Sequence, residues 1–219
     1  MTDYSRPETV SLEDLRDRIK TTDLVPSRVV LLEDIDGIFE KISQKGILTW
    51  TDLQKSIKNP KHMEVFSSET GIDLQYLVLL RREVEGYSPK PFNLKDIDWV
   101  PQAAIIKLVE NGILNSDVLL SKLREMNLRK SFADKAEIDL ETMNYLLNLA
   151  SLCRVQWVSP TAGRMLIEAG YETCQKLASA DTDELFTAMD RVNKKGKYFN
   201  GTIGARDIKR IIDAAKYVI

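Results

Sequence analysis

The chain has 219 residues, of which 43% are hydrophobic and 29% are charged, and its formal net charge at pH 7 is −2. This composition is typical of a folded globular protein, and ten glycines and two cysteines exclude a collagen-like chain and a disulfide scaffold. The sequence pI near 5.6 means that contact with nucleic acid would need a local basic patch.

Residues 1–31 are predicted to form an N-terminal helical arm. Its helix is expected to start at Ser11, with Asp14 in the capping-box position. The arm has no apolar run of signal-peptide length, and no run in the chain approaches the roughly 18 residues of a membrane span. We therefore expect a cytoplasmic protein that makes no membrane contact.

The rest of the chain contains an internal repeat. Residues 46–80 align without a gap with residues 112–146. The nine identical pairs are Gly46/Gly112, Ile47/Ile113, Leu48/Leu114, Leu53/Leu119, Phe66/Phe132, Ile72/Ile138, Asp73/Asp139, Leu74/Leu140 and Leu80/Leu146. Most of these residue types form cores or end helices, so the pattern indicates shared structure.

A third copy follows at a further offset of 58, where Trp157 and Gly170 match Trp99 and Gly112. It carries an insertion, residues 193–201, before its last helix. Upstream, residues 32–36 resemble residues 94–98. The distance from this segment to the glycine is about one helical turn shorter in the first copy, so its hairpin is expected to be shorter. The predicted division is an arm (1–31) followed by three helical repeats (32–88, 93–155 and 156–219).

All segments are predicted to be helical, because apolar residues recur at helical spacing, as in Ile208, Ile211, Ile212 and Ala215. Short helices are expected to end at C-cap glycines, and a leucine seven residues after each glycine is expected to be buried. The glycine–leucine pairs are Gly46/Leu53, Gly112/Leu119 and Gly170/Leu177. The expected N-caps are Thr51 or Asp52, Ser116 or Asp117, Asp181 or Asp183, Asp73 and Asp139.

Residues 87–92 are the best candidate for a linker. Pro89 and Pro91 stop the preceding helix and favour an extended connection. A helix that ran unbroken through residues 86–94 would contradict this prediction.

Few residues offer catalytic chemistry. His62 is the only histidine and is interpreted as a surface or helix-start residue. Cys153 and Cys174 are interpreted as buried thiols. The acid pairs Asp34/Asp36 and Asp96/Asp98 could suggest a metal or acid–base site, but their repetition favours N-capping of a hairpin helix. We expect no enzyme, no metal and no cofactor.

The element from Trp157 to Gly170, WVSPTAGRMLIEAG, resembles the "GIGPKTAELLLEAG" element of helix-hairpin-helix domains. Over residues 32–219 the chain also resembles an uncharacterised bacterial family of tandem helix-hairpin-helix (SAM-like) repeats. The resemblance implies an all-α fold of three tandem helix-hairpin-helix-like units with an N-terminal helical arm.

In DNA-binding helix-hairpin-helix domains, hairpin glycines let backbone amides approach a phosphate. The glycine positions are Trp99 and Pro101 in the second copy and Trp157 and Ser159 in the third. Tryptophan blocks this approach and proline has no amide donor, so the second copy is expected to be structural. The hydroxyls of Ser159 and Thr161 could contact a phosphate or cap the next helix.

A basic stretch is the remaining functional clue. Residues 191–210 contain one acid, Asp207, and seven basic residues: Arg191, Lys194, Lys195, Lys197, Arg206, Lys209 and Arg210. Tyr198 and Phe199 interleave with them, a combination that suits single-stranded nucleic acid. The alternative interpretation is a solvated loop and helix face with both aromatic rings packed on the core.

Two functions follow from these features. The first is a non-enzymatic binding or scaffold module that mediates interaction with an unidentified protein or with a second copy. The alternative is weak, non-sequence-specific nucleic-acid binding through the third repeat, at Ser159, Thr161 and the seven basic residues.

Overall fold

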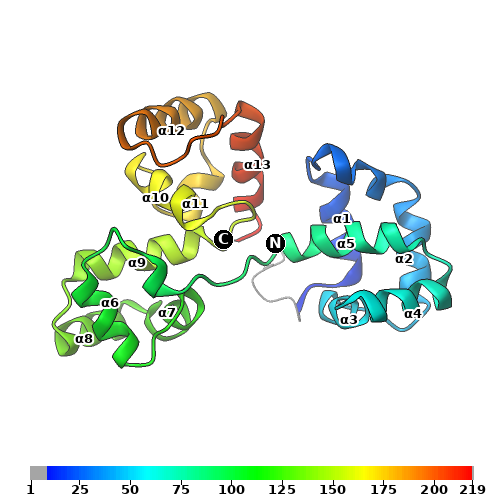
Figure 1. The fold of residues 1–219 in the computed structure, drawn as a ribbon, viewed down its shortest axis with the longest axis horizontal. Coiled ribbons are helices and arrows are strands. Elements are labelled where there is room, and N and C mark those ends of the chain that lie inside the picture. Colours follow the sequence, from blue (N-terminus) through cyan, green and yellow to red (C-terminus); the bar gives the residue numbers. More distant parts are fainter. Residues whose placement is uncertain (1–8, 219) are drawn as a thin grey trace. The chain divides into compact units, whose positions relative to one another are not determined.

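The computed structural model describes residues 9–218 and is all-α, as predicted (Figure 1). Apart from two isolated bridges, these residues form no β-structure. Predictions for residues 1–8 and 219, at the ends of the predicted arm and third repeat, lie outside the described residues. The helices, with 3-10 helices written η, are α1 (Leu12–Thr21), η2 (Pro26–Leu32), α2 (Ile35–Ser43), α3 (Trp50–Ser56), α4 (Pro60–Thr70), α5 (Leu74–Gly86), η3 (Leu94–Asp96), α6 (Gln102–Glu110), α7 (Ser116–Leu123), α8 (Met126–Ala136), α9 (Leu140–Leu152), α10 (Pro160–Glu168), α11 (Cys174–Ala178), α12 (Thr182–Gly196) and α13 (Ala205–Ala215).

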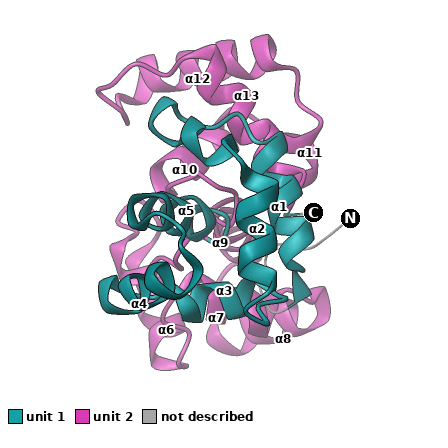
Figure 2. Cartoon of the chain, turned by 90° about the vertical axis from the view of Figure 1, so that its right-hand side faces the viewer, with its two compact units in different colours: residues 1–88, 218 teal, residues 89–217, 219 magenta. Residues whose placement is uncertain are grey.

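The chain divides into two compact units at the predicted linker (Figure 2). Unit 1 contains the described residues up to Ser88, together with Val218, and unit 2 contains residues 89–217. Helix α5 ends at Gly86, and the next helical element begins only at Leu94. The prolines at 89 and 91 therefore lie in a non-helical connection, as the sequence predicts.

The same turn occurs three times, each time with the same distance along the chain from its glycine to the next N-cap. Gly46, Gly112 and Gly170 have φ of 76°, 73° and 91°, a left-handed conformation that glycine adopts without strain. The N-cap of the next helix lies three residues after each glycine, at Thr49, Asn115 and Thr173.

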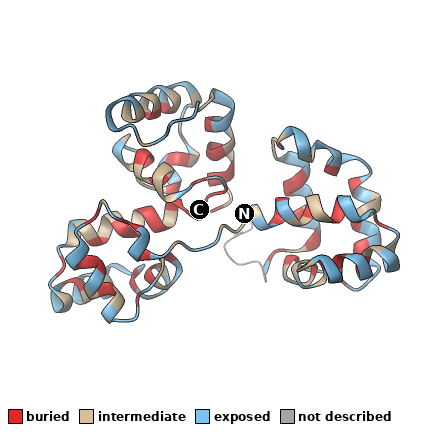
Figure 3. Ribbon diagram, in the orientation of Figure 1, coloured by how far each residue is buried: buried red, intermediate tan, exposed pale blue. Residues whose placement is uncertain are grey.

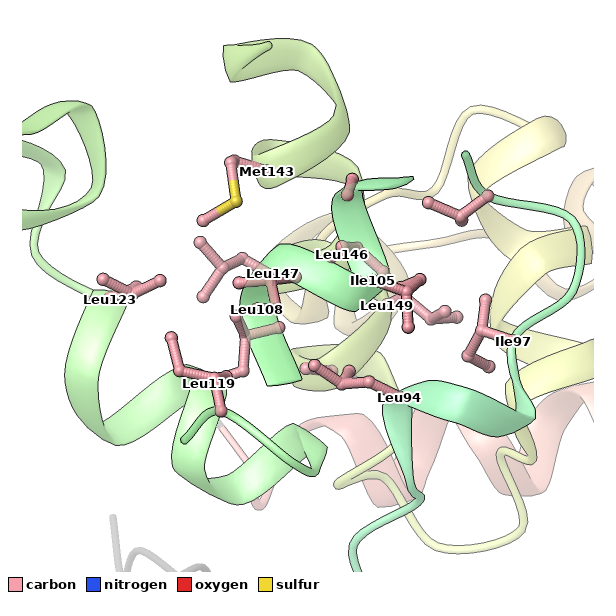
Figure 4. Close-up of a cluster of buried hydrophobic side chains, with 14 of the residues drawn as sticks. Leu94, Ile97, Ile105, Leu108, Leu119, Leu123, Met143, Leu146, Leu147 and Leu149 are labelled. Carbon is pink, nitrogen blue, oxygen red and sulfur yellow. The ribbon is translucent and has the colours of Figure 1, made fainter. Parts of the chain in front are cut away.

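Each of these helices has a core leucine four residues after its N-cap. Leu53, Leu119 and Leu177 are all fully buried, which confirms the prediction made from the glycine spacing. Figure 4 shows Leu119 beside Leu108 in the core of unit 2. Buried residues, red in Figure 3, line the inner faces of the helices within each unit.

Backbone pairing adds a further correspondence, which the sequence does not reveal. Ser11 pairs with Thr49 in an isolated antiparallel bridge, and Asn93 pairs with Asn115 in the same way. In unit 1 the residue before α1 therefore pairs with the N-cap of α3. In unit 2 the residue before η3 pairs with the N-cap of α7 in the same way. The described part of the arm is packed into unit 1.

The N-terminal segment also covers one face of α5. Arg28 of η2 forms an ion pair of 2.5 Å with Glu83, which is 1% exposed. Tyr76 donates from Oη to the Leu31 carbonyl at 2.8 Å. Burial raises the pKa of Tyr76, because the charged phenolate would be poorly solvated. These contacts attach η2 along the length of α5.

Four predicted N-caps are correct, since Ser11, Asp73, Asp139 and Asp181 each accept a first-turn amide. The N-caps predicted for α3 and α7 are wrong by one to three residues. Thr49 caps α3 in place of Thr51 or Asp52, and Asn115 caps α7 in place of Ser116 or Asp117. The turn after each glycine is short, so the N-cap lies only three residues after the glycine and precedes the polar residues from which it was predicted.

The capping role predicted for the repeated acid pairs is also wrong. Asp34 occupies the N-cap position of α2, but it has a φ of 48° and its carboxylate caps no amide. Asp36 pairs with Lys20 at 2.9 Å. Asp96 and Asp98 precede Pro101, the N-cap of α6, so neither can cap that helix.

Candidate functional site

The hairpin before α10 holds a tryptophan in an unusual backbone conformation. Trp157 has a φ of 68°, in the left-handed region, and its side chain is 39% exposed. Only glycine adopts this conformation without steric cost. Trp157 occupies the first hairpin glycine position implied by the resemblance, so the backbone keeps the glycine-like turn while presenting an indole ring.

The two hydroxyl residues of this hairpin lie at the start of α10. Ser159 is its N-cap, and Ser159 Oγ accepts from the Ala162 amide at 3.2 Å. Thr161 lies in the first turn and is half-buried. The Ser159 hydroxyl therefore performs the capping role that the sequence offers as the alternative to phosphate contact.

Four of the candidate basic residues lie at the end of α12. Arg191, Lys194 and Lys195 lie on its last turns, and Lys197 is its C-cap, with a φ of 52°. Lys194 forms an ion pair of 2.6 Å with Asp190. Asp190 lies directly before the basic stretch, so the net charge of residues 191–210 does not include it.

The other three basic residues lie on α13, where acids one helical turn away form ion pairs with two of them. Lys209 pairs with Asp213 at 2.5 Å and Arg210 with Asp207 at 3.5 Å. The third residue, Arg206, is exposed. Including Asp190 and Asp213 lowers the local formal charge from +6 to +4. Helices α12 and α13 pack against each other, which brings the two groups into one part of unit 2.

The insertion loop, residues 193–201, comprises the last turn of α12 and the non-helical residues after it, and specific contacts hold it in place. Asn193 donates to the Phe199 carbonyl and accepts from the Phe199 amide, both at 2.9 Å. Tyr198 donates from Oη to Glu168 of α10 at 2.9 Å and accepts from Arg164 at 3.1 Å. Phe199 itself is 49% exposed. The two aromatic residues therefore differ, since Tyr198 packs on α10 and Phe199 faces solvent.

Arg164 links this loop to the preceding repeat. Its guanidinium carbon lies 4.3 Å from the ring centroid of Tyr198 and 5.2 Å from that of Trp99. Trp99 in turn donates from Nε1 to Tyr145 Oη of α9 at 2.8 Å. Burial raises the pKa of Tyr145, so its hydroxyl stays protonated. Sequence analysis missed this network because nothing in the residue spacing relates its members.

Unit 1 contains a groove between α1 and α2, which we call the α1–α2 groove. It has a volume of 660 Å³. It is lined by Ser11, Leu12, Glu13, Arg16, Asp36, Gly37, Phe39, Glu40, Ser43, Ile47 and Leu48. Leu12, Phe39 and Ile47 are nearly buried and form an apolar floor, whereas Leu48 is 66% exposed. Sequence analysis did not predict this groove.

The two cysteines are buried, and the histidine lies at a helix start. Cys153 and Cys174 are free, buried thiols, and burial raises the pKa of Cys153 to about 12. His62 lies at the start of α4, with Nδ1 2.8 Å from Asn59 Oδ1. Among residues 9–218, no group of three or more His, Cys, Asp or Glu side chains is arranged to hold a metal ion. None of the helices formed by these residues is long and apolar enough to cross a membrane.

Comparison with protein-family models gives a match to the C-terminal half of the chain. A family model described as "Domain of unknown function (DUF4332)" matches residues 100–218, more than half of the chain and nearly all of unit 2. Searches of curated proteins and of solved structures find no match.

Proposed function

We propose that this chain, which belongs to the DUF4332 family, is a non-enzymatic scaffold of three tandem helix-hairpin-helix-like repeats that mediates protein–protein interaction. The observation that carries the proposal is Trp157, a partly exposed tryptophan held in a left-handed backbone conformation.

The recurring geometry supports the three-repeat interpretation. The left-handed glycine, the N-cap three residues later and the buried leucine four residues after that recur around Gly46, Gly112 and Gly170. Helix α9 of the second repeat packs against α10 of the third, where Gly163 leaves room for Leu149. A Cβ at residue 163 would lie 2.8 Å from Leu149 Cδ1, so the small residue supports close helix packing.

The strain at Trp157 supports a role for its side chain. A left-handed residue other than glycine costs roughly 1–2 kcal/mol, and residues under such strain concentrate at functional sites. Tryptophan is also among the residue types most enriched at the positions that dominate binding energy in protein interfaces. An indole presented at this turn suits insertion into a pocket of a partner protein.

Two equivalent leucines provide further exposed apolar surface. Leu48 is 66% exposed and Leu114 is 53% exposed, and each follows a buried isoleucine in its turn. Residues at corresponding positions in two repeats can contact two sites of one partner, which raises the total affinity.

The experiment is capture of binding partners with the full-length chain. Immobilised parent, Trp157→Gly and Leu128→Ala proteins are compared by quantitative mass spectrometry, and each captured protein is then purified and titrated. Leu128 is 57% exposed on α8 and serves as the matched control for loss of an exposed apolar side chain.

We expect a purified partner to bind the parent and Leu128→Ala about equally and to bind Trp157→Gly at least about tenfold more weakly. Its affinity should depend little on salt, because the contact is apolar. Equal binding by all three proteins, or no reproducible partner, would contradict the proposal.

The alternative function is weak nucleic-acid binding through the third repeat. Exposed Lys195 and Lys197 lie close in sequence to the exposed ring of Phe199, which favours it. The capping role of Ser159, the packing of Tyr198 on α10 and the acids beside Lys194, Lys209 and Arg210 favour the protein-binding proposal.

A further inference from the structure

The α1–α2 groove and the insertion loop have complementary chemistry. The groove joins the apolar floor described above to three acids, Glu13, Asp36 and Glu40. Arg16 lies 3.5 Å from Glu13 and 3.4 Å from Asp36, which reduces the negative charge at that end. Glu40 lies on the second turn of α2 and gives the α2 side of the groove a negative charge.

The insertion loop presents the opposite combination. Phe199 is half-exposed, and Lys194, Lys195 and Lys197 lie close to it in the sequence. The double hydrogen bond from Asn193 and the contact of Tyr198 with Glu168 hold the Phe199 backbone in place. Gly201 has no side chain to obstruct the ring, since a Cβ there would lie 2.6 Å from Phe199. A fixed loop loses little entropy when it binds.

We propose that the α1–α2 groove of one copy binds the insertion loop of a second copy, with Phe199 on the apolar floor and the lysines beside the acids. This inference rests on the proposed protein-binding function and names one partner, although it uses a surface other than Trp157.

The charges of the two units support this choice of partner. Residues 1–88 contain 12 basic and 16 acidic residues, whereas residues 89–219 contain 19 basic and 17 acidic residues. Unit 1 is therefore negative and unit 2 positive, so unit 1 of one molecule attracts unit 2 of another. The groove and the loop thus satisfy both the apolar and the electrostatic requirements of a contact.

Sedimentation equilibrium of the full chain tests the proposal. At about 0.05 M salt the average mass should rise above 24.9 kDa as the protein concentration increases, and at about 0.5 M salt this rise should diminish. Two charge-reversal variants, Glu13→Lys/Glu40→Lys and Lys195→Glu/Lys197→Glu, should each weaken self-association at least about tenfold.

Combining the two reversals restores opposite charges and should bring the affinity back to within about threefold of the parent. Phe199→Ser should weaken association without any change in charge, and Glu64→Lys, an exposed reversal on α4 outside the groove, should have no effect. A monomer at every concentration, or no recovery in the combined variant, would overturn the proposal. Trp157→Gly should self-associate as the parent does, so failure here is distinguishable from failure of the Trp157 proposal.

Discussion

The guanidinium carbon of Arg18 lies 3.8 Å from the ring centroid of Tyr87, and both side chains are almost completely buried. Arg18 belongs to α1, and Tyr87, the first residue of the predicted linker, is the C-cap of α5. Burial raises the pKa of Tyr87, which keeps the ring neutral beneath the cation. This contact joins the start of unit 1 to its end.

Replacement of Arg18 should therefore destabilise unit 1 strongly. Arg18→Met removes a desolvated cation–π contact and should lower the free energy of unfolding by about 2–3 kcal/mol. Arg16→Met, on the same helix, removes ion pairs at the surface and should cost less than about 1 kcal/mol. Urea denaturation of both variants measures the difference, and equal stabilities would show that α1 is not anchored through Tyr87.

The buried leucine after Gly112 should be far more important for stability than the exposed leucine of the same turn. Leu119→Ala should cost about 2–5 kcal/mol, because it leaves a cavity in the core of unit 2. Leu114→Ala alters a side chain that is 53% exposed and should cost less than about 1 kcal/mol. Thermal unfolding checks the pair, and similar costs would contradict the placement of Leu119.

The left-handed turn at Gly112 should tolerate asparagine better than alanine. Its φ is 73°, and a Cβ there would meet only Lys122 Nζ, at 3.8 Å, so conformational strain decides the cost. Gly112→Ala should lose about 1–2 kcal/mol, and Gly112→Asn should lose less, since asparagine enters this region more readily. Chemical denaturation of the two variants would count against this account if asparagine proved the more costly.

The N-cap at Asp139 should contribute to acid stability. The backbone amide of Thr142 donates to Asp139 Oδ1 at 2.7 Å and holds the pKa of Asp139 below its ordinary value of 3.8. Because the folded-state pKa is lower than the unfolded one, the stabilisation is complete above about pH 4 and is lost as the pH falls through the folded-state pKa.

Asparagine caps helices at any pH, so Asp139→Asn should lose less thermal stability than the parent between about pH 5 and about pH 2. Asp98→Asn, which alters an exposed acid that caps no helix, is the matched control and should follow the parent. Identical pH profiles for Asp139→Asn and the parent would show that this cap contributes nothing.

The sequence predicts the parts of the fold that depend on residue type at fixed spacing. Gly112 and Leu119 are identifiable because a left-handed turn favours glycine and a core favours leucine, and both recur at the same offset. The linker is identifiable because proline cannot continue a helix.

Other features depend on backbone pairing and on contacts between distant residues. The bridge between Ser11 and Thr49 uses main-chain groups, so neither residue type indicates it. The sequence locates Trp157 at the hairpin, but its left-handed φ and its exposure follow from the folded backbone around it. Asp213 lies outside the basic stretch of residues 191–210, but one helical turn brings it beside Lys209. The resulting ion pair offsets the positive charge of that lysine.

If the third hairpin contacts protein through Trp157, as proposed, the third repeat should not be a phosphate site. Fluorescence anisotropy with a labelled single strand and a labelled duplex at low salt tests this requirement most directly, because it requires no knowledge of the partner. The parent protein and a Lys194→Glu, Lys195→Glu, Lys197→Glu variant are titrated in parallel. Neither protein should show saturable binding up to tens of micromolar. Saturable binding by the parent in the non-specific range of about 10⁻⁴–10⁻⁶ M, abolished by the three reversals, would contradict it.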